Sequence, residues 1–174
     1  MSDSIPSVSI INGRLVDPAN QVDDMLDLHI SQGHILATGD KPAGFEPDKV
    51  IDASGKIVCP GLIDLSVRLR EPGLESKGTI ATETRAAAHA GITTLITLPD
   101  TSPVTDSPAV MELIRRRAKQ SGHARVLCLG ALTKNLDGKE LSEMAALQNA
   151  GCVSVTNAGR PLGNTLIERR ALEY

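Results

Sequence analysis

Hydrophobic and polar positions alternate in short runs through the first third of the chain. The runs are rich in β-branched and other apolar residues and lie at 7–16, 26–31, 35–38, 49–51 and 57–58. Three dipeptides that favour tight turns separate or interrupt them, namely Asn12-Gly13, Gln32-Gly33 and Ser54-Gly55. The pattern predicts a small all-β module, part of a β-sandwich, over residues 1–59.

From residue 60 onward, strand-like runs alternate with helical segments. The strands are expected at 62–69, 93–98, 125–129 and 152–155. Helices are expected to begin at Thr79, Ser107, Ser142 and Asn164, and the first three to end at Gly91, Gly122 and Gly151. Alternating strands and helices favour parallel βαβ units with right-handed crossovers.

The number of these units sets the expected architecture. A (β/α)8 barrel takes about 250 residues, whereas residues 60–174 hold four βα units. Four strands cannot close a barrel, and an open half-barrel exposes two strand edges. We therefore predict an α/β fold: the N-terminal half of a TIM-like barrel preceded by the β module, in a chain truncated from a longer protein. The alternative is that another molecule covers the edges.

Composition limits the partners and the cellular compartment that we expect for this protein. A formal net charge of −3 without a basic stripe argues against nucleic acid. There is no apolar run of the ~18 residues that span a bilayer, and the N-terminus lacks a signal-peptide pattern, so we expect a cytoplasmic protein with no membrane partner. Cys59, Cys128 and Cys152 are odd in number and widely spaced, which indicates reduced core thiols.

The most informative stretch, residues 60–73, reads PGLIDLSVRLREPG. Alternation places Asp64, Ser66 and Arg68 on one face of the predicted strand. The segment closely resembles the Asp-x-His-x-His-Leu-Arg-Glu-Pro-Gly motif of the dihydroorotases, whose two histidines bind zinc. Ser66 and Arg68 stand where the histidines belong. A hydroxyl is a poor zinc ligand, and a guanidinium has no lone pair to donate.

The resemblance to the dihydroorotases extends from about Val8 to the C-terminus. It is carried also by the segments GKIVCPGLID at 55–64, TIATETRAAA at 79–88, GALTK at 130–134 and AGCV at 150–153. The resemblance implies an amidohydrolase-type barrel over residues 60–174. Family membership alone would imply zinc-dependent, reversible cyclisation of N-carbamoylaspartate to dihydroorotate.

A second metal-linked segment is also altered. The resemblance implies a Ser-Asp-Asp-Gly-like turn after the fourth strand, which supplies a carboxylate to the metal site. Here residues 155–161 read VTNAGRP, so Asn157 and Ala158 replace both acids. A carboxamide oxygen is a weak neutral ligand, and alanine offers none. We expect a degenerate metal site at Ser66, Arg68, Asn157 and Ala158, with no metal, no cofactor and no catalytic residue.

The positions implied to bind substrate are mixed. Arg70 matches the arginine that grips the substrate carboxylate in the family, but Asp100 stands where the family has asparagine. Like charges about 4 Å apart at an effective dielectric near 20 repel by roughly 4 kcal/mol, which disfavours a dianionic substrate. Arg70 and Asp100 are thus either a vestigial substrate site or, as we favour, a structural ion pair.

Two further groups of cations each leave two interpretations open. Arg68 either occupies the vacated metal space and pairs with Asp64, or decorates an unused pocket. The basic run Arg115-Arg116-Arg117 with Lys119 is either a solvated helix face, which we favour, or a contact with an acidic partner subunit.

The leading hypothesis is a catalytically inactive dihydroorotase-like subunit. The sequence resembles the degenerate chain that some bacteria pair with the catalytic chain of aspartate carbamoyltransferase in a hetero-oligomer of pyrimidine biosynthesis. One alternative is an active zinc-dependent dihydroorotase or other cyclic amidohydrolase with remodelled ligands. Another is a metal-free binder that uses Arg70 as a carboxylate anchor.

Overall fold

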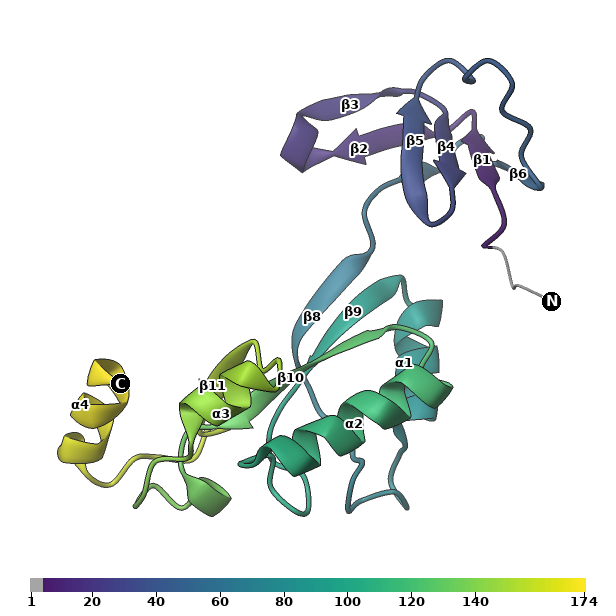
Figure 1. Cartoon of the computed structure of the whole chain (residues 1–174). Coiled ribbons are helices and arrows are strands. Elements are labelled where there is room, and N and C mark those ends of the chain that lie inside the picture. The colour runs from purple at the N-terminus through teal and green to yellow at the C-terminus, as the bar shows by residue number, and fades with distance from the viewer. Residues whose placement is uncertain (1–4) are drawn as a thin grey trace. The chain divides into compact units, whose positions relative to one another are not determined.

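The computed structural model describes residues 5–174, and the chain divides into two compact units between Pro60 and Gly61 (Figure 1). Each unit is described by itself. Within residues 5–174, none of the helices combines the length and the apolar character needed to cross a bilayer.

The first unit consists of two small sheets. One has the strand order β5-β4-β1-β6 and the other the order β3-β2-β7. The strands are β1 (Val8–Ile11), β2 (Arg14–Asp17), β3 (Val22–Met25), β4 (Leu28–Ser31), β5 (His34–Thr38), β6 (Lys49–Asp52) and β7 (Ile57–Val58), and the 3-10 turn η1 (Pro18–Asn20) joins β2 to β3. Strand β1 pairs antiparallel with β4 and parallel with β6.

Two features of this unit depart from the sequence pattern. The run at 7–16 forms two strands, because Asn12 adopts a left-handed φ of 62° and Gly13 packs closely against β7. A Cβ on Gly13 would lie 2.6 Å from Cγ2 of Val58, so only glycine fits there. Strand β3 was not predicted, because its sequence VDDM is largely exposed and carries two acids.

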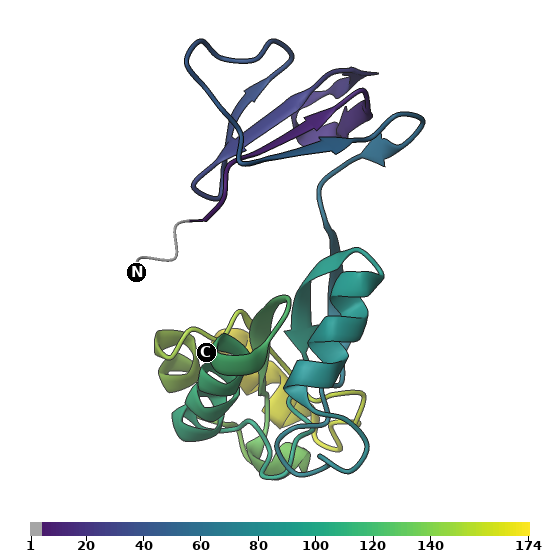
Figure 2. The same cartoon turned by 90° about the vertical axis from the view of Figure 1, so that its right-hand side faces the viewer.

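The second unit alternates strands and helices as expected. It contains β8 (Leu62–Val67), α1 (Ile80–His89), β9 (Ile92–Thr97), α2 (Pro108–Ser121), β10 (Arg125–Ala131), the 3-10 turn η2 (Lys134–Leu136), α3 (Met144–Asn149), β11 (Ser154–Thr156) and α4 (Thr165–Glu173). The four strands pair in parallel in the order β11-β10-β9-β8. Figure 2 shows the same elements from a second direction. The predicted α/β fold with four βα units is confirmed.

Three of the four helices have their N-cap at the expected residue, and two of these have a side-chain capping bond. Thr79 forms a reciprocal capping box with Thr82, and Oδ1 of Asn164 accepts a hydrogen bond of 2.9 Å from the amide of Leu166. Helix α2 has its N-cap at Ser107, but without a side-chain cap bond. The expected cap at Ser142 is wrong: its hydroxyl donates to the carbonyl of Ala131 instead, and α3 begins at Met144.

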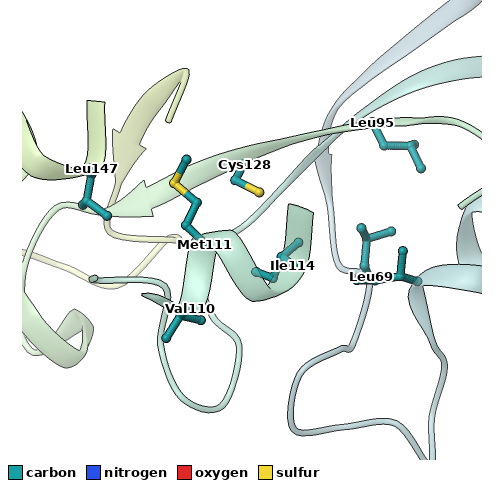
Figure 3. Packing of buried hydrophobic residues seen from close by; sticks show 8 residues of the cluster. Leu69, Leu95, Val110, Met111, Ile114, Cys128 and Leu147 are labelled. Carbon is teal, nitrogen blue, oxygen red and sulfur yellow. The ribbon is translucent and has the colours of Figure 1, made fainter. Parts of the chain in front are cut away.

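The hydrophobic core lies between the sheet of the second unit and helices α1 to α3 (Figure 3). It contains Leu69, Ile80, Leu95, Val110, Met111, Ile114, Cys128 and Leu147. Full burial of an aliphatic side chain of this kind contributes about 1.5–3 kcal/mol. Because Leu69 belongs to this cluster, the core fixes the chain just beyond β8. Leu69 is next to Arg68, one of the two residues that replace the histidines of the dihydroorotase motif.

The three cysteines do not share one environment. Cys128 is 2% exposed, and burial raises the pKa of its thiol to about 12. Cys152 is half-buried, and its thiol donates to the carbonyl of Ser154. The expectation of a core thiol is wrong for Cys59, which is exposed, because it lies in the extended link before Pro60 rather than in either sheet.

Candidate functional site

The residues singled out by the sequence gather at the carboxyl ends of the parallel strands. The segments that follow β8, β9, β10 and β11 begin at Arg68, Leu98, Leu132 and Asn157. Parallel strands end at a common edge of the sheet, and α/β proteins place their ligand sites there. We therefore take this edge as the candidate site.

Arg68 forms an ion pair at this edge. Its Nε donates to Oδ2 of Asp100 at 2.6 Å and so links the segment after β8 to the segment after β9. The Arg68 side chain is 46% exposed and that of Asp100 22%. Of the two interpretations left open for Arg68, the pairing with Asp64 is wrong. Oδ1 of Asp64 instead accepts a hydrogen bond of 2.9 Å from the amide of Ser66 on its own strand.

Arg70 does not take part in this ion pair. The favoured Arg70–Asp100 ion pair is wrong, because Asp100 is engaged by Arg68 and Arg70 forms no salt bridge within residues 5–174. Arg70 is exposed and has a left-handed φ of 65°, and its carbonyl accepts from the amide of Leu74 at 2.8 Å. Arg70 is therefore exposed and has no ion pair with the residues that the structure describes.

The hollow beside these residues is small. Arg68, Arg70 and Asp100 line a space of about 40 Å³, room for only a few water molecules. Pockets that enclose organic ligands are roughly 300–1,000 Å³. The residues at this edge therefore do not by themselves enclose a substrate of the size of N-carbamoylaspartate.

A carboxylate that sequence reasoning missed organises the segment after β8. Oε2 of Glu71 accepts from the amide of Ile80, in the first turn of α1, at 2.7 Å, and Oε1 accepts from Nη1 of Arg117 at 2.7 Å. Nη1 of Arg117 also lies 3.4 Å from Oε1 of Glu75. A carboxylate at a helix N-terminus is stabilised by the unpaired amides and the helix dipole. Glu71 thus ties the loop to both α1 and α2.

The solvated-face interpretation of the basic run is wrong at Arg117. Its side chain is 36% exposed and is held by Glu71, whose side chain is 15% exposed. A sequence signal for this existed, because Arg117 follows Val110 by seven residues and Ile114 by three. Residues at those spacings share one helix face, and Val110 and Ile114 are buried.

Asn157 is a buried link between two segments of the site edge. It is 8% exposed, its Oδ1 accepts from the hydroxyl of Thr133 at 2.7 Å, and its Nδ2 donates to the carbonyl of Arg160 at 3.1 Å. The Thr133 oxygen in turn accepts from the amide of Gly138 at 3.0 Å. Ala158 continues the turn with a left-handed φ of 51°. Both ends of the Asn157 carboxamide are therefore satisfied by protein.

These residues do not fit a zinc ion. Zinc sites are built from thiolate, imidazole and carboxylate donors, and residues 5–174 contain no group of three or more His, Cys, Asp or Glu that could hold a metal. Arg68 brings a positive charge to the end of β8, and the carboxamide of Asn157 is occupied by Thr133 and Arg160. Ser66 is exposed and Ala158 has no donor side chain.

The Arg68–Asp100 pair is expected to contribute modestly to stability. Because Arg68 is about half exposed, a double-mutant cycle with R68A, D100A and the double variant should give a coupling energy of about 0.5–1 kcal/mol, decreasing with added salt. Urea unfolding followed by far-UV circular dichroism measures it. A coupling energy of zero would show that the pair does not fasten the two segments.

Comparison with known proteins gives a consistent result. Residues 55–168 match the model of the Dihydro-orotase-like family. A dihydroorotase-like protein of Pseudomonas aeruginosa is 49% identical over 168 residues, covering 97% of this chain and 40% of that protein. A dihydroorotase of Syntrophotalea carbinolica is 45% identical over 167 residues, covering 96% of this chain and 39% of that protein. The chain thus spans about 40% of the length of these curated relatives.

Solved structures with the same fold include hydantoinases. L-hydantoinase from Arthrobacter aurescens aligns with a TM-score of 0.74 and 27% identity, over 87% of this chain and 32% of that chain. A D-hydantoinase aligns with a TM-score of 0.66 and 25% identity, over 86% of this chain and 32% of that chain. The expected amidohydrolase-type half-barrel is confirmed by these similarities.

Proposed function

Because the chain belongs to the dihydroorotase-like family, we propose that it is part of a catalytically inactive, cytoplasmic dihydroorotase-like subunit. In this proposal the subunit serves pyrimidine biosynthesis as a structural partner of the catalytic chain of aspartate carbamoyltransferase. The observation that carries the proposal is the ion pair of Arg68 with Asp100 at the end of the strand that should present zinc ligands.

The loss of catalysis is supported by the chemistry of the site edge. Zinc lowers the pKa of a bound water from 15.7 to about 7 and so supplies the hydroxide that attacks an amide near neutral pH. Arg68 is paired to Asp100, and Asn157 is committed to Thr133 and Arg160. None of these side chains offers a free anionic ligand, so we infer that no such hydroxide is generated here.

A scaffold role is supported by the way the same edge is held together. The Arg68–Asp100 pair and the Glu71–Arg117 pair fix the segment after β8 to its neighbours, and Asn157 fixes the segment after β11. Side chains at positions that the family resemblance links to metal or substrate binding thus hold neighbouring segments of the fold together. The identity of the partner rests on the resemblance to the degenerate chains that assemble with aspartate carbamoyltransferase.

An active cyclic amidohydrolase is the second candidate. It is favoured by the relatives named dihydroorotase at 42–46% identity and by Arg70, which is retained and exposed. On this alternative, a metal site would need ligands other than Ser66, Arg68, Asn157 and Ala158.

Co-purification separates the two candidates. The full-length protein is produced with the aspartate carbamoyltransferase of the same cell, and complex formation, transferase activity, zinc content and dihydroorotate turnover are measured on one sample. We expect a complex whose transferase activity depends on this protein, without stoichiometric zinc or turnover. Stoichiometric zinc together with turnover and no complex would refute the proposal in favour of the enzyme.

A further inference from the structure

A groove outside the candidate site lies between the C-terminal half of α2 and the start of β10. Its volume is about 540 Å³. Arg115, Arg116, Lys119 and Arg125 line it with positive charge, and Ala118 and Val126 line it with apolar surface. Both apolar residues pack against the buried core, so the groove wall is part of the rigid body of the unit. We call this feature the basic groove.

The charge of the basic groove is concentrated and largely uncompensated. Among the lining residues Glu112 alone is acidic, whereas the whole chain has a net charge of −3. Arg115 is partly engaged, since its Nη1 donates to the carbonyl of Ala150 at 2.9 Å and lies 3.4 Å from Glu112. In the part of the chain that the structure describes, the side chains of Arg116, Lys119 and Arg125 form no hydrogen bond or ion pair.

This arrangement costs stability in the isolated chain. Like charges three and four residues apart on a helix repel, and Lys119 lies at those spacings from Arg116 and Arg115. Arg117, in the same run, is instead paired with Glu71. Within the run, Arg117 therefore stabilises the fold through its ion pair with Glu71. Arg116 and Lys119 are available to bind an anion on another molecule.

We propose that the basic groove is the docking site for an acidic segment of the partner protein. The carboxylates of this segment pair with the cationic side chains of the groove, and one of its apolar side chains contacts Ala118 and Val126. The inference rests on the proposed function, in which that partner is the aspartate carbamoyltransferase chain. Arginine forms bidentate pairs with carboxylates. The apolar surface of Ala118 and Val126 favours a protein segment. None of the lining residues is aromatic, so none can stack on a base, which argues against a nucleotide.

The groove is also placed so that docking leaves the candidate site edge unobstructed. Arg125 begins β10, and so lies at the amino end of the strand, opposite the carboxyl ends where Arg68 and Asn157 lie. Exposed charges at an interface mainly change the association rate constant and the salt dependence of binding. Docking should therefore weaken steeply as the ionic strength rises.

The test compares R116E/K119E with R85E/K56E in the full-length protein. The control makes the same change of charge at exposed residues outside the groove. Dissociation constants for the transferase chain are measured by sedimentation at about 50 and about 300 mM salt, which changes the Debye length more than twofold. The same proteins are titrated with a poly-L-glutamate peptide and with ATP. Circular dichroism checks folding, and R116Q/K119Q replaces R116E/K119E if that variant is misfolded.

We expect R116E/K119E to bind the transferase about tenfold or more weakly at low salt, with a smaller difference at high salt and the control within about twofold of wild type. If wild type binds and R116E/K119E binds equally well, the groove proposal is overturned while the proposed function stands. If wild type does not bind the transferase, the proposed function fails. The groove is then supported by poly-L-glutamate binding that R116E/K119E abolishes, and overturned by its absence or by preferred binding of ATP.

Discussion

Replacing Arg117 with alanine is expected to lower the free energy of unfolding of the second unit by about 2 kcal/mol. The change leaves the Glu71 carboxylate, which is 15% exposed, without its cationic partner, and an unpaired carboxylate of low exposure is costly. Arg117 is itself 36% exposed, so the loss should be smaller than the 3–5 kcal/mol typical of fully buried pairs. Urea unfolding followed at 222 nm measures this, because the described α-helices all lie in the second unit.

The neighbouring arginine provides the matched control. Arg116 has the same chemistry, the same helix and an adjacent position, but it is exposed and has no partner in the described part of the chain. R116A should change the free energy of unfolding by less than about 0.5 kcal/mol. E71Q should resemble R117A in direction, because it removes the charge while its side-chain oxygen can still accept from Ile80. Equal effects of R117A and R116A would contradict the role of the Glu71–Arg117 pair.

The order of the elements could be predicted from the sequence because it depends on local chemistry. Alternation located most strands, and Thr79 and Asn164 marked helix starts through capping bonds to residues two or three positions away. Strand β3 carried no such signal, because two consecutive acids interrupt its alternation. Local rules also placed the start of α3 too early, since Ser142 bonds to Ala131, eleven residues away.

The partners of the charged residues at the site edge could not be predicted in the same way. Arg68 and Asp100 are 32 residues apart, and Glu71 and Arg117 are 46 residues apart. Their meeting depends on how two loops and a helix are brought together by the parallel sheet. The residue types at the altered motif were readable from the sequence, but the choice of Asp100 over Asp64 as the partner of Arg68 required the folded geometry.

Placing an acid at position 157 is expected to destabilise the protein by about 2 kcal/mol at neutral pH. N157D keeps the oxygen that accepts from Thr133 but loses the amide that donates to the carbonyl of Arg160. It also buries a carboxylate at a position that is 8% exposed, and losing a donor to a buried carbonyl typically costs about 1–3 kcal/mol. Asn164 supplies the control, because it uses only Oδ1, as an acceptor for the amide of Leu166. N164D should therefore be neutral or slightly stabilising.

The pH dependence of N157D tests the same explanation. Burial and the facing carbonyl should raise the pKa of the new carboxyl in the folded state above its value in the unfolded chain. A protonated carboxyl can donate to the Arg160 carbonyl, so the deficit relative to wild type should shrink toward acid pH. It should reach its full size as the pH rises through the raised pKa. Urea unfolding of wild type, N157D and N164D across this range measures the deficit. A deficit that is independent of pH, or that N164D shares, would show that the Asn157 amide does not stabilise the turn. A metal-ligating carboxylate at position 157 would then again be compatible with the fold.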